Sequence, residues 1–76
     1  MKKRCAPMLL VHNNEGDEVF FHYHDEARAR QYEEPKVVWV VMNSDYFIGT
    51  WQFAKTIEGY AGYYESEEEA EKAIKS

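Results

Sequence analysis

The chain lacks the features that define several common protein classes. Its single cysteine, Cys5, excludes an intrachain disulfide and with it a disulfide-stapled secreted scaffold. No run approaches the roughly 20 apolar residues of a membrane-spanning helix. The apolar part of the N-terminal segment is too short for the core of a signal peptide. We therefore expect a cytoplasmic protein in a reducing compartment.

Positive charge is also scarce. Nine Lys and Arg residues stand against 14 Asp and Glu residues, which gives a formal net charge of −5. Binding to duplex nucleic acid or to an anionic membrane relies on basic side chains that neutralise phosphates, and the sequence contains no basic stripe of the required size. We therefore expect neither direct nucleic-acid binding nor membrane binding.

Motifs of the common enzyme classes are missing as well. The sequence has no Gly-rich phosphate loop, no Gly-x-Ser-x-Gly elbow, no Cys-x-x-Cys pair and no His-Glu-x-x-His motif. Cys5 is a candidate nucleophile whose pKa the neighbouring Lys2, Lys3 and Arg4 would lower. We expect residues 1–6 to be loosely ordered, and a loose terminus does not hold a general base in place. The sequence thus predicts a non-catalytic protein without a cofactor.

The sequence does contain the apolar content of one small folded domain, residues 1–76. Twelve of the 76 residues are Phe, Tyr or Trp, and such large rings supply much of the burial available to a small core. A domain of this size removes only about 60% of its unfolded surface from water, so its stability margin is thin.

Residues 36–53, KVVWVVMNSDYFIGTWQF, organise the rest of the chain. Two apolar runs flank Asn43-Ser44-Asp45, a pattern that predicts a β-hairpin with strands at 36–42 and 46–53. The break has no glycine, so a two-residue and a three-residue loop both remain open, and the register decides which side chains share a face. In either register residues 37–42 are apolar on both faces and need cover on both sides. Because so short a chain seldom supplies that cover, the pattern points to a partner.

A second hairpin is predicted upstream, with strands at residues 8–12 and 18–24 joined by the turn-forming residues 13–17. The simplest register places His12 opposite Glu18 and Val11 opposite Val19. One face then forms a core wall of Leu9, Val11, Val19, Phe21 and Tyr23, and the other face carries Met8, Leu10, His12, Phe20, His22 and His24.

The C-terminal segment predicts a strand at residues 60–64 and a helix at 66–75. Ser66 and Glu69 match the Ser-x-x-Glu capping box of a helix N-terminus. Residues 25–34 are rich in helix formers and end before a proline, so they predict either a helix or a loop. Together these elements indicate a small α+β domain: an antiparallel sheet of about five strands, with both helical segments on one face.

The histidines suggest a metal site as an alternative function. His12, His22 and His24 have carboxylates nearby in the sequence. In the predicted register, however, His12 lies about 13 Å from His22 along the sheet, because strands rise about 3.3 Å per residue. His22 and His24 point to one face but lack a fixed third ligand. We therefore assign no metal ligands.

The aromatic and acidic side chains favour a protein partner instead. Trp and Tyr are preferred anchors of protein interfaces, and the C-terminal acidic run can match a basic site. The predicted function is a non-catalytic interaction module. It would either form a homodimer or occupy the basic site of a larger protein such as a nucleic-acid-binding protein, and in kind it is similar to the short acidic inhibitors of phages. A further alternative is a single-stranded nucleic-acid binder that uses sheet aromatics. The candidate partner-binding residues are Trp39, Tyr46, Trp51, Tyr60, Tyr63, Tyr64, Glu65, Glu67, Glu68 and Glu71.

Overall fold

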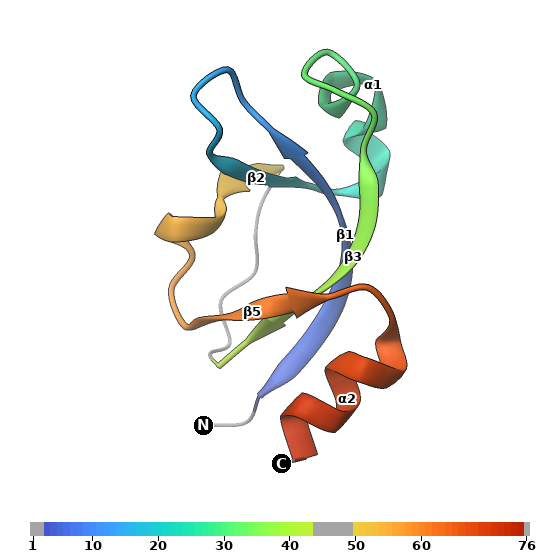
Figure 1. The fold of residues 1–76 in the computed structure, drawn as a ribbon, viewed down its shortest axis with the longest axis vertical. Coiled ribbons are helices and arrows are strands. Elements are labelled where there is room, and N and C mark those ends of the chain that lie inside the picture. Colours follow the sequence, from blue (N-terminus) through green and yellow to red (C-terminus); the bar gives the residue numbers. More distant parts are fainter. Residues whose placement is uncertain (1–2, 44–49, 76) are drawn as a thin grey trace.

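The fold is built on one antiparallel sheet whose five strands lie in the order β4-β2-β1-β3-β5 (Figure 1). The computed structural model describes residues 3–43 and 50–75. Its strands are β1 (Arg4–His12), β2 (Glu18–Phe21), β3 (Lys36–Met42), β4 (Trp51–Phe53) and β5 (Tyr60–Tyr64). Its helices are α1 (Glu26–Ala29), α2 (Glu67–Lys75) and the 3-10 turns η1 (Tyr23–Asp25) and η2 (Ala54–Thr56). The predicted α+β class is confirmed.

The first hairpin forms in the predicted register, with His12 opposite Glu18 and Val11 opposite Val19. Its turn is closed locally, because the Asn13 side-chain oxygen accepts hydrogen bonds from the backbone N–H groups of Glu15 and Asp17, both at 2.9 Å. Gly16 has a φ of +84°, a conformation that glycine adopts at little cost. β2 ends at Phe21 instead of residue 24, because the chain enters η1 at Tyr23.

The predicted hairpin between residues 36–42 and 46–53 is wrong. β3 pairs with β1 and β5, whereas β4 pairs with β2 at the opposite edge of the sheet. The backbone N–H of Asn43 donates to the Gly59 carbonyl at 2.7 Å, so the end of β3 bonds to the segment that precedes β5. The rest of the predicted loop and the start of the predicted strand lie outside the described residues.

The N-terminal strand is longer than predicted. β1 begins at Arg4, which pairs with Met42, so residues 4–6 belong to the sheet and are not the loose terminus that we expected. β2 ends opposite Leu9, and at Pro7 the strand therefore has a paired neighbour, β3, on one side only. Prolines are tolerated at such edge positions because they have no N–H group to donate.

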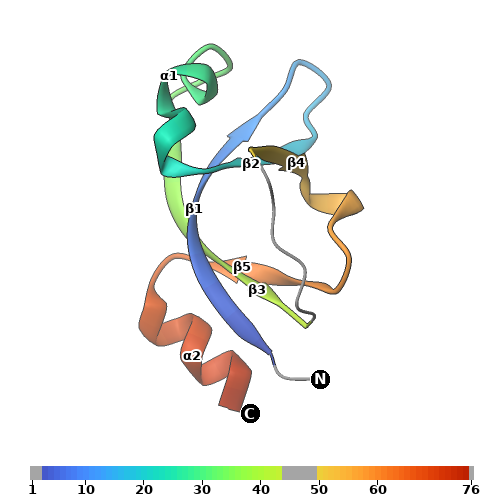
Figure 2. The same cartoon turned by 180° about the vertical axis from the view of Figure 1, so that it is seen from behind.

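The sheet is strongly curved, as Figures 1 and 2 show, and it encloses one of its own faces. Alternate side chains of the three central strands gather inside this curve, and η2 and β5 add residues that close it. The inner cluster consists of Met8, Leu10, Phe20, Val38, Val40, Met42, Ala54 and Ile57, with Tyr60 and Tyr63 packed against it.

The other face of the sheet carries both α-helices, at opposite ends (Figure 2). α1 is much shorter than the predicted 25–34 segment, but its buried Ala29 packs on the sheet. The outer cluster consists of Leu9, Val11, Val19, Phe21 and Ala29, with Phe53 packed against it. Tyr23, which we expected in this wall, instead lies in η1 and is 51% exposed.

The C-terminal helix is confirmed. α2 begins at Glu67, and the Ser66 hydroxyl accepts a hydrogen bond from the Glu69 N–H at 3.2 Å, as a capping residue should. Ala70, a residue of α2, is fully buried. α2 therefore covers the outer face of β1 and β3 where α1 does not reach.

Sheet curvature on one side and α2 on the other explain how so short a chain covers both faces of β3. Val38, Val40 and Met42 are enclosed in the inner cluster, and on the other face Val41 is buried. Our expectation that the chain could not shelter this strand alone is therefore wrong for most of its length. On the outer face Trp39 is only half-buried, and Val37 is 49% exposed.

Among the described residues, no helix has the length and apolar character needed to cross a membrane.

Candidate functional site

A row of four apolar side chains crosses the outer face between the two helices. The strand registers place Trp51 beside Phe21, Phe21 beside Leu9, and Leu9 beside Val37. The two middle residues are buried, whereas Trp51 and Val37 at the ends are 43% and 49% exposed. The row is thus continuous with the outer cluster and opens to solvent at both ends.

Two aromatic rings contact Phe21, next to the Trp51 end of the row. Its ring centroid lies 5.8 Å from that of Tyr32 and 6.3 Å from that of Trp51, with the tryptophan nearly parallel at 27°. The Trp51 ring meets Phe53 edge to face at 5.4 Å. These contacts hold Trp51 in place, yet much of its ring and of Tyr32 remains exposed, as in a preorganised interface anchor.

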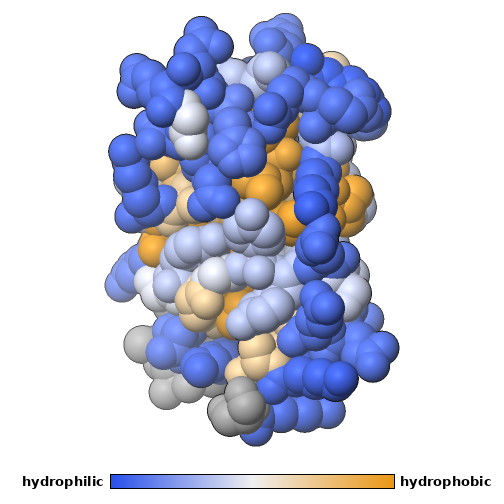
Figure 3. Space-filling model, in the orientation of Figure 1, coloured by the Kyte–Doolittle hydropathy of each residue, from blue (hydrophilic) through white to orange (hydrophobic). Residues whose placement is uncertain are grey.

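Tyr23 and Val37 define the other end. Together with Leu9 and Glu26 they line a shallow cavity of about 250 Å³. Figure 3 shows a hydrophobic patch on the right side of the molecule, between the parts occupied by α1 and α2. We call the exposed large side chains of this face the outer apolar surface; they are Tyr23, Tyr32, Val37 and Trp51.

The predicted aromatic residues do not form one surface. Trp51 belongs to the outer apolar surface, while Trp39 and Tyr64 lie opposite each other on β3 and β5, both half-buried. Tyr64 also lines a shallow hollow beside α2 with Glu69, Lys72 and Ala73. Tyr46 lies outside the described residues.

Tyr60 and Tyr63 pack inward. Their ring centroids lie 5.8 Å and 6.0 Å from that of the fully buried Phe20. Burial, followed by the nearby charge of Glu18, raises the pKa of Tyr60 to about 12. The pKa of Tyr63 is also raised, first by burial and then by the charge and hydrogen bond of Glu18. These two rings mainly close the inner cluster.

The acidic residues have neighbours within the chain. Glu65 forms an ion pair with Lys36, and Glu68 lies 4.0 Å from the Lys72 amine. Glu71 accepts a hydrogen bond from the Cys5 thiol at 3.5 Å. Glu67 is exposed on the first turn of α2. Part of the negative charge of this region is therefore balanced internally.

The thiol of Cys5 is suppressed instead of activated. Burial, then the hydrogen bond and charge of Glu71 and the charge of Glu67, raise the thiol pKa above its ordinary value of 9.0. We expected the basic N-terminal residues to lower this pKa. The pairing of β1 with β3 places Cys5 under α2, where carboxylates determine its environment.

The histidines are separated as the hairpin register implies. His12 interacts with Glu33, and the rings of His22 and His24 stack with centroids 5.2 Å apart. Within residues 3–43 and 50–75, no group of three or more His, Cys, Asp or Glu side chains is arranged to hold a metal ion.

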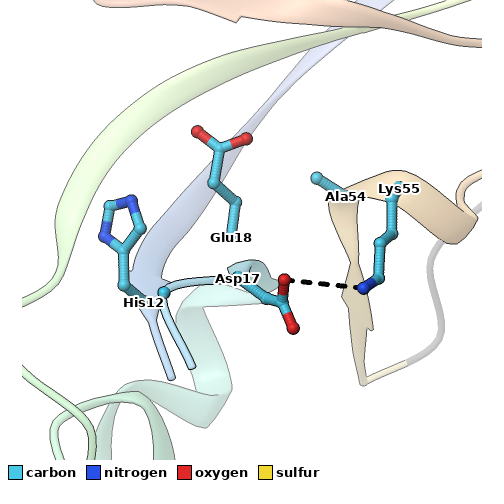
Figure 4. Close-up of a pocket in the computed structure, with 6 residues that line it drawn as sticks. His12, Asp17, Glu18, Ala54 and Lys55 are labelled. Atoms are coloured by element: carbon cyan, nitrogen blue, oxygen red, sulfur yellow. Dashed lines mark hydrogen bonds and ion pairs between the residues drawn. The ribbon is translucent and has the colours of Figure 1, made fainter. Parts of the chain in front are cut away.

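A polar cavity of about 380 Å³ lies at the turn end of the first hairpin (Figure 4). Asp17 and Lys55 form an ion pair across it at 3.5 Å, and the side chains of His12 and Glu18 lie on its other side. The paired positions of His12 and Glu18 follow from the predicted register, but the contribution of η2 does not, because the pairing of β4 with β2 brings it there. Asp17 and Lys55 pair with each other, whereas His12 bonds Glu33, which does not line the cavity.

Comparisons with protein-family models, with curated proteins and with solved structures found no match.

Proposed function

We propose that this protein is a non-catalytic protein-protein interaction module that binds its partner through the outer apolar surface. The observation that carries the proposal is the exposure of Tyr23, Tyr32, Val37 and Trp51 on one face of so small a domain. The buried Phe21 and Leu9 join Trp51 and Val37 into one apolar row, and apolar patches with a polar rim are typical of binding sites in monomeric proteins. Two of the four exposed side chains are tyrosines and one is a tryptophan, the residue types that most often dominate binding energy.

The polar rim of this surface also fits a recognition role. Arg30, which follows α1, forms ion pairs with Glu26 of the helix at 2.8 Å and with Glu34 beyond it at 2.7 Å. Glu26 lines the cavity beside Tyr23 and Val37, and its charge is already paired with Arg30, so a partner that binds there need not desolvate a lone charge. A cytoplasmic partner suits a chain whose single cysteine cannot form an intrachain disulfide.

Two kinds of partner are consistent with the proposal. A second copy of the chain would make the protein a homodimer, and a larger basic protein would make it an acidic inhibitor of the phage type. Glu65 and Glu68 are paired with lysines of the chain, so negative charge alone would not explain binding to a basic protein. The apolar contact would supply most of the affinity in either case.

The experiment compares partner capture from native extract by the wild-type chain and by Val37→Glu. Val37 is exposed, so the added charge leaves the core intact while it disrupts an apolar contact. Asn14→Glu, in the exposed turn of the first hairpin, adds the same charge away from the surface. Loss of capture or of self-association with Val37→Glu alone supports the proposal. Equal binding by all three proteins contradicts it.

A further inference from the structure

The outer apolar surface lies in a gap between two helices. α1 contacts β1 toward one end of the outer face, and α2 contacts β1 and β3 toward the other end (Figure 2). The floor of the gap is the row described above, Trp51, Phe21, Leu9 and Val37. Domains cover the apolar face of a sheet with helices or with a second sheet. On this face the covering layer consists of helices, and it is missing in the middle.

A second row of side chains widens the floor on the side of α2. Pro7 lies opposite Trp39, and Trp39 lies opposite Tyr64. Because side chains alternate along a strand, Pro7 and Trp39 share the outer face with Leu9 and Val37. Pro7 is exposed, and Trp39 and Tyr64 are half-buried. The floor is therefore two rows wide and contains aromatic side chains of the types that anchor partners.

The shape of the gap selects a helix that crosses the strands. Figures 1 and 2 show β1 and β3 bent along their length around the inner cluster, so the outer face is convex in the strand direction. A straight rod contacts such a face over its greatest length when it lies across the strands, along the row. Neighbouring strands lie about 4.8 Å apart, so the row from β4 to β3 spans about 14 Å. A helix has a pitch of about 5.4 Å, so about ten residues with one apolar side chain per turn would place a contact near each strand.

Both sides of the gap carry net negative charge. On the α1 side, residues 25–34 contain four acidic and two basic side chains. On the α2 side, residues 65–75 contain five acidic side chains and two lysines, and the balance stays negative when Lys36, the partner of Glu65, is included. Basic groups on both flanks of a bound helix would therefore meet a favourable potential, which contributes more to selectivity and association rate than to affinity.

We propose that the gap between α1 and α2 binds an amphipathic helix of a partner protein. The apolar stripe of that helix lies along the row from Trp51 to Val37, and Lys or Arg residues flank the stripe on both sides. The inference rests on the proposed interaction function and names the kind of partner that the outer apolar surface takes. Such a helix is recognised through apolar side chains at positions i, i+3, i+4 and i+7, and its polar face stays in solvent.

A second copy of the chain fits the gap less well. Two copies that met through this face would place net negative segments against each other, whichever helix of one copy lay beside which helix of the other. The fully exposed residues of α2 are all Glu or Lys, so this helix offers no apolar stripe to another copy. α1 has only four residues and is too short to fill the gap. Charge and shape therefore favour a foreign basic helix over self-association.

The test uses three peptides and the two tryptophan indole N–H signals in magnetic resonance spectra of the full chain. The first peptide, Lys-Leu-Lys-Ala-Leu-Ile-Gln-Lys-Leu-Lys-Ala-Leu-Ile-Lys, has an apolar stripe flanked by lysines and should shift the signals of Trp39 and Trp51. The second has Glu in place of every Lys and should bind about tenfold more weakly at low salt, with a smaller difference at high salt. The third has Pro in place of its Gln, cannot form a continuous helix, and should lose binding.

Neutral protein variants locate the contact. Val37→Ser removes an apolar contact without adding charge and should weaken binding of the lysine peptide about three- to tenfold, as expected for two methyl groups. Asn14→Ser, in the exposed turn of the first hairpin, should bind as the wild type does. Equal binding of the glutamate peptide or of the proline peptide, an unchanged Trp51 signal, or equal affinity of Val37→Ser and wild type would each overturn the inference. Sedimentation as a dimer that Val37→Ser dissociates would also overturn it.

These outcomes are distinct from those of the capture experiment. Loss of capture with Val37→Glu, without peptide binding at the two tryptophans, would overturn the helix inference and leave the proposed function in place. Equal capture by wild type, Val37→Glu and Asn14→Glu, together with helical peptide binding at both tryptophans, would contradict the proposed function but support the gap as a helix-binding site.

Discussion

Glu33 clamps His12 from two directions: one carboxylate oxygen accepts a hydrogen bond from the His12 backbone N–H at 2.8 Å and lies 2.9 Å from the ring Nδ1. The contact ties the end of β1 to the segment that follows α1. It lowers the pKa of Glu33 below its ordinary value of 4.5, chiefly through the bond to the ring and then through the backbone bond.

This clamp predicts a pH-dependent contribution to stability. Because the Glu33 pKa is lower in the folded state, its contribution is complete above pH 4.5 and is lost as the pH falls through the folded value. Both side chains are about half exposed, so the effect should be small. Glu33→Gln should flatten the fall in urea-unfolding free energy below pH 5, and Glu15→Gln should not. An unchanged acid profile in Glu33→Gln would contradict the assignment.

Tyr60 predicts an alkaline transition. Its pKa is about 12 in the folded state and 10.0 ordinarily, so its contribution to stability is complete below pH 10 and is lost between pH 10 and about 12. Tyr60→Phe, which keeps the ring against Phe20 but cannot ionise, should lose less stability over this interval. Ultraviolet titration should also show one late-titrating tyrosine fewer. Identical titration curves for wild type and variant would refute the prediction.

Cys5 should react slowly with thiol reagents. Burial, followed by Glu71, raises its pKa above 9.0, and the thiolate is the reactive form. Glu71→Gln removes a negative charge while burial remains, so alkylation at pH 8 should become modestly faster but stay slower than in the unfolded chain. Glu68→Gln, on the same helix, is the matched control. A faster rate in Glu68→Gln than in Glu71→Gln would show that helix fraying, and not Glu71, controls the thiol.

Ser66 should contribute to the stability of α2 through its cap. Ser66→Ala removes the acceptor of the Glu69 N–H and should cost about 1 kcal/mol, which corresponds to roughly 4–8 °C in melting temperature for a domain of this size. Ser66→Asp should retain most of the stability, because aspartate also caps helices. Melting curves of the three proteins provide the measurement. A loss as large in Ser66→Asp as in Ser66→Ala would argue against capping.

The elements that the sequence predicted well are those defined by neighbouring residues. The first hairpin and its register depend on the turn at Asn13 to Asp17, and α2 depends on the cap at Ser66. The turn and the cap are both formed by residues close in the sequence, so a short window of sequence is enough to predict them. The β3 pairings are not local, and the assumption that consecutive strands pair, which holds about two-thirds of the time, failed for β3 and β4.

The candidate site was predictable only in part for the same reason. Trp51 was expected at an interface and lies on the outer apolar surface, as does Val37, which begins the segment whose two apolar faces pointed to a partner; Tyr23 and Tyr32 were not expected there. Tyr23 was assigned to a strand that ends earlier, and the exposure of Val37 depends on how far each helix extends. The inward packing of Tyr60 and Tyr63 depends on the curvature of the whole sheet, which no local pattern encodes.

The central position of β1 has a consequence for synthesis. As the chain leaves the ribosome, the strand made first can pair early with β2, but its second neighbour β3 emerges about two dozen residues after it. The ring of Phe20 stays uncovered for longer still, until Tyr60 and Tyr63 have been translated. Nascent chains that stall before β5 should therefore expose hydrophobic aromatic surface. Such chains should be bound by chaperones or degraded by proteases, whereas chains that include β5 should not.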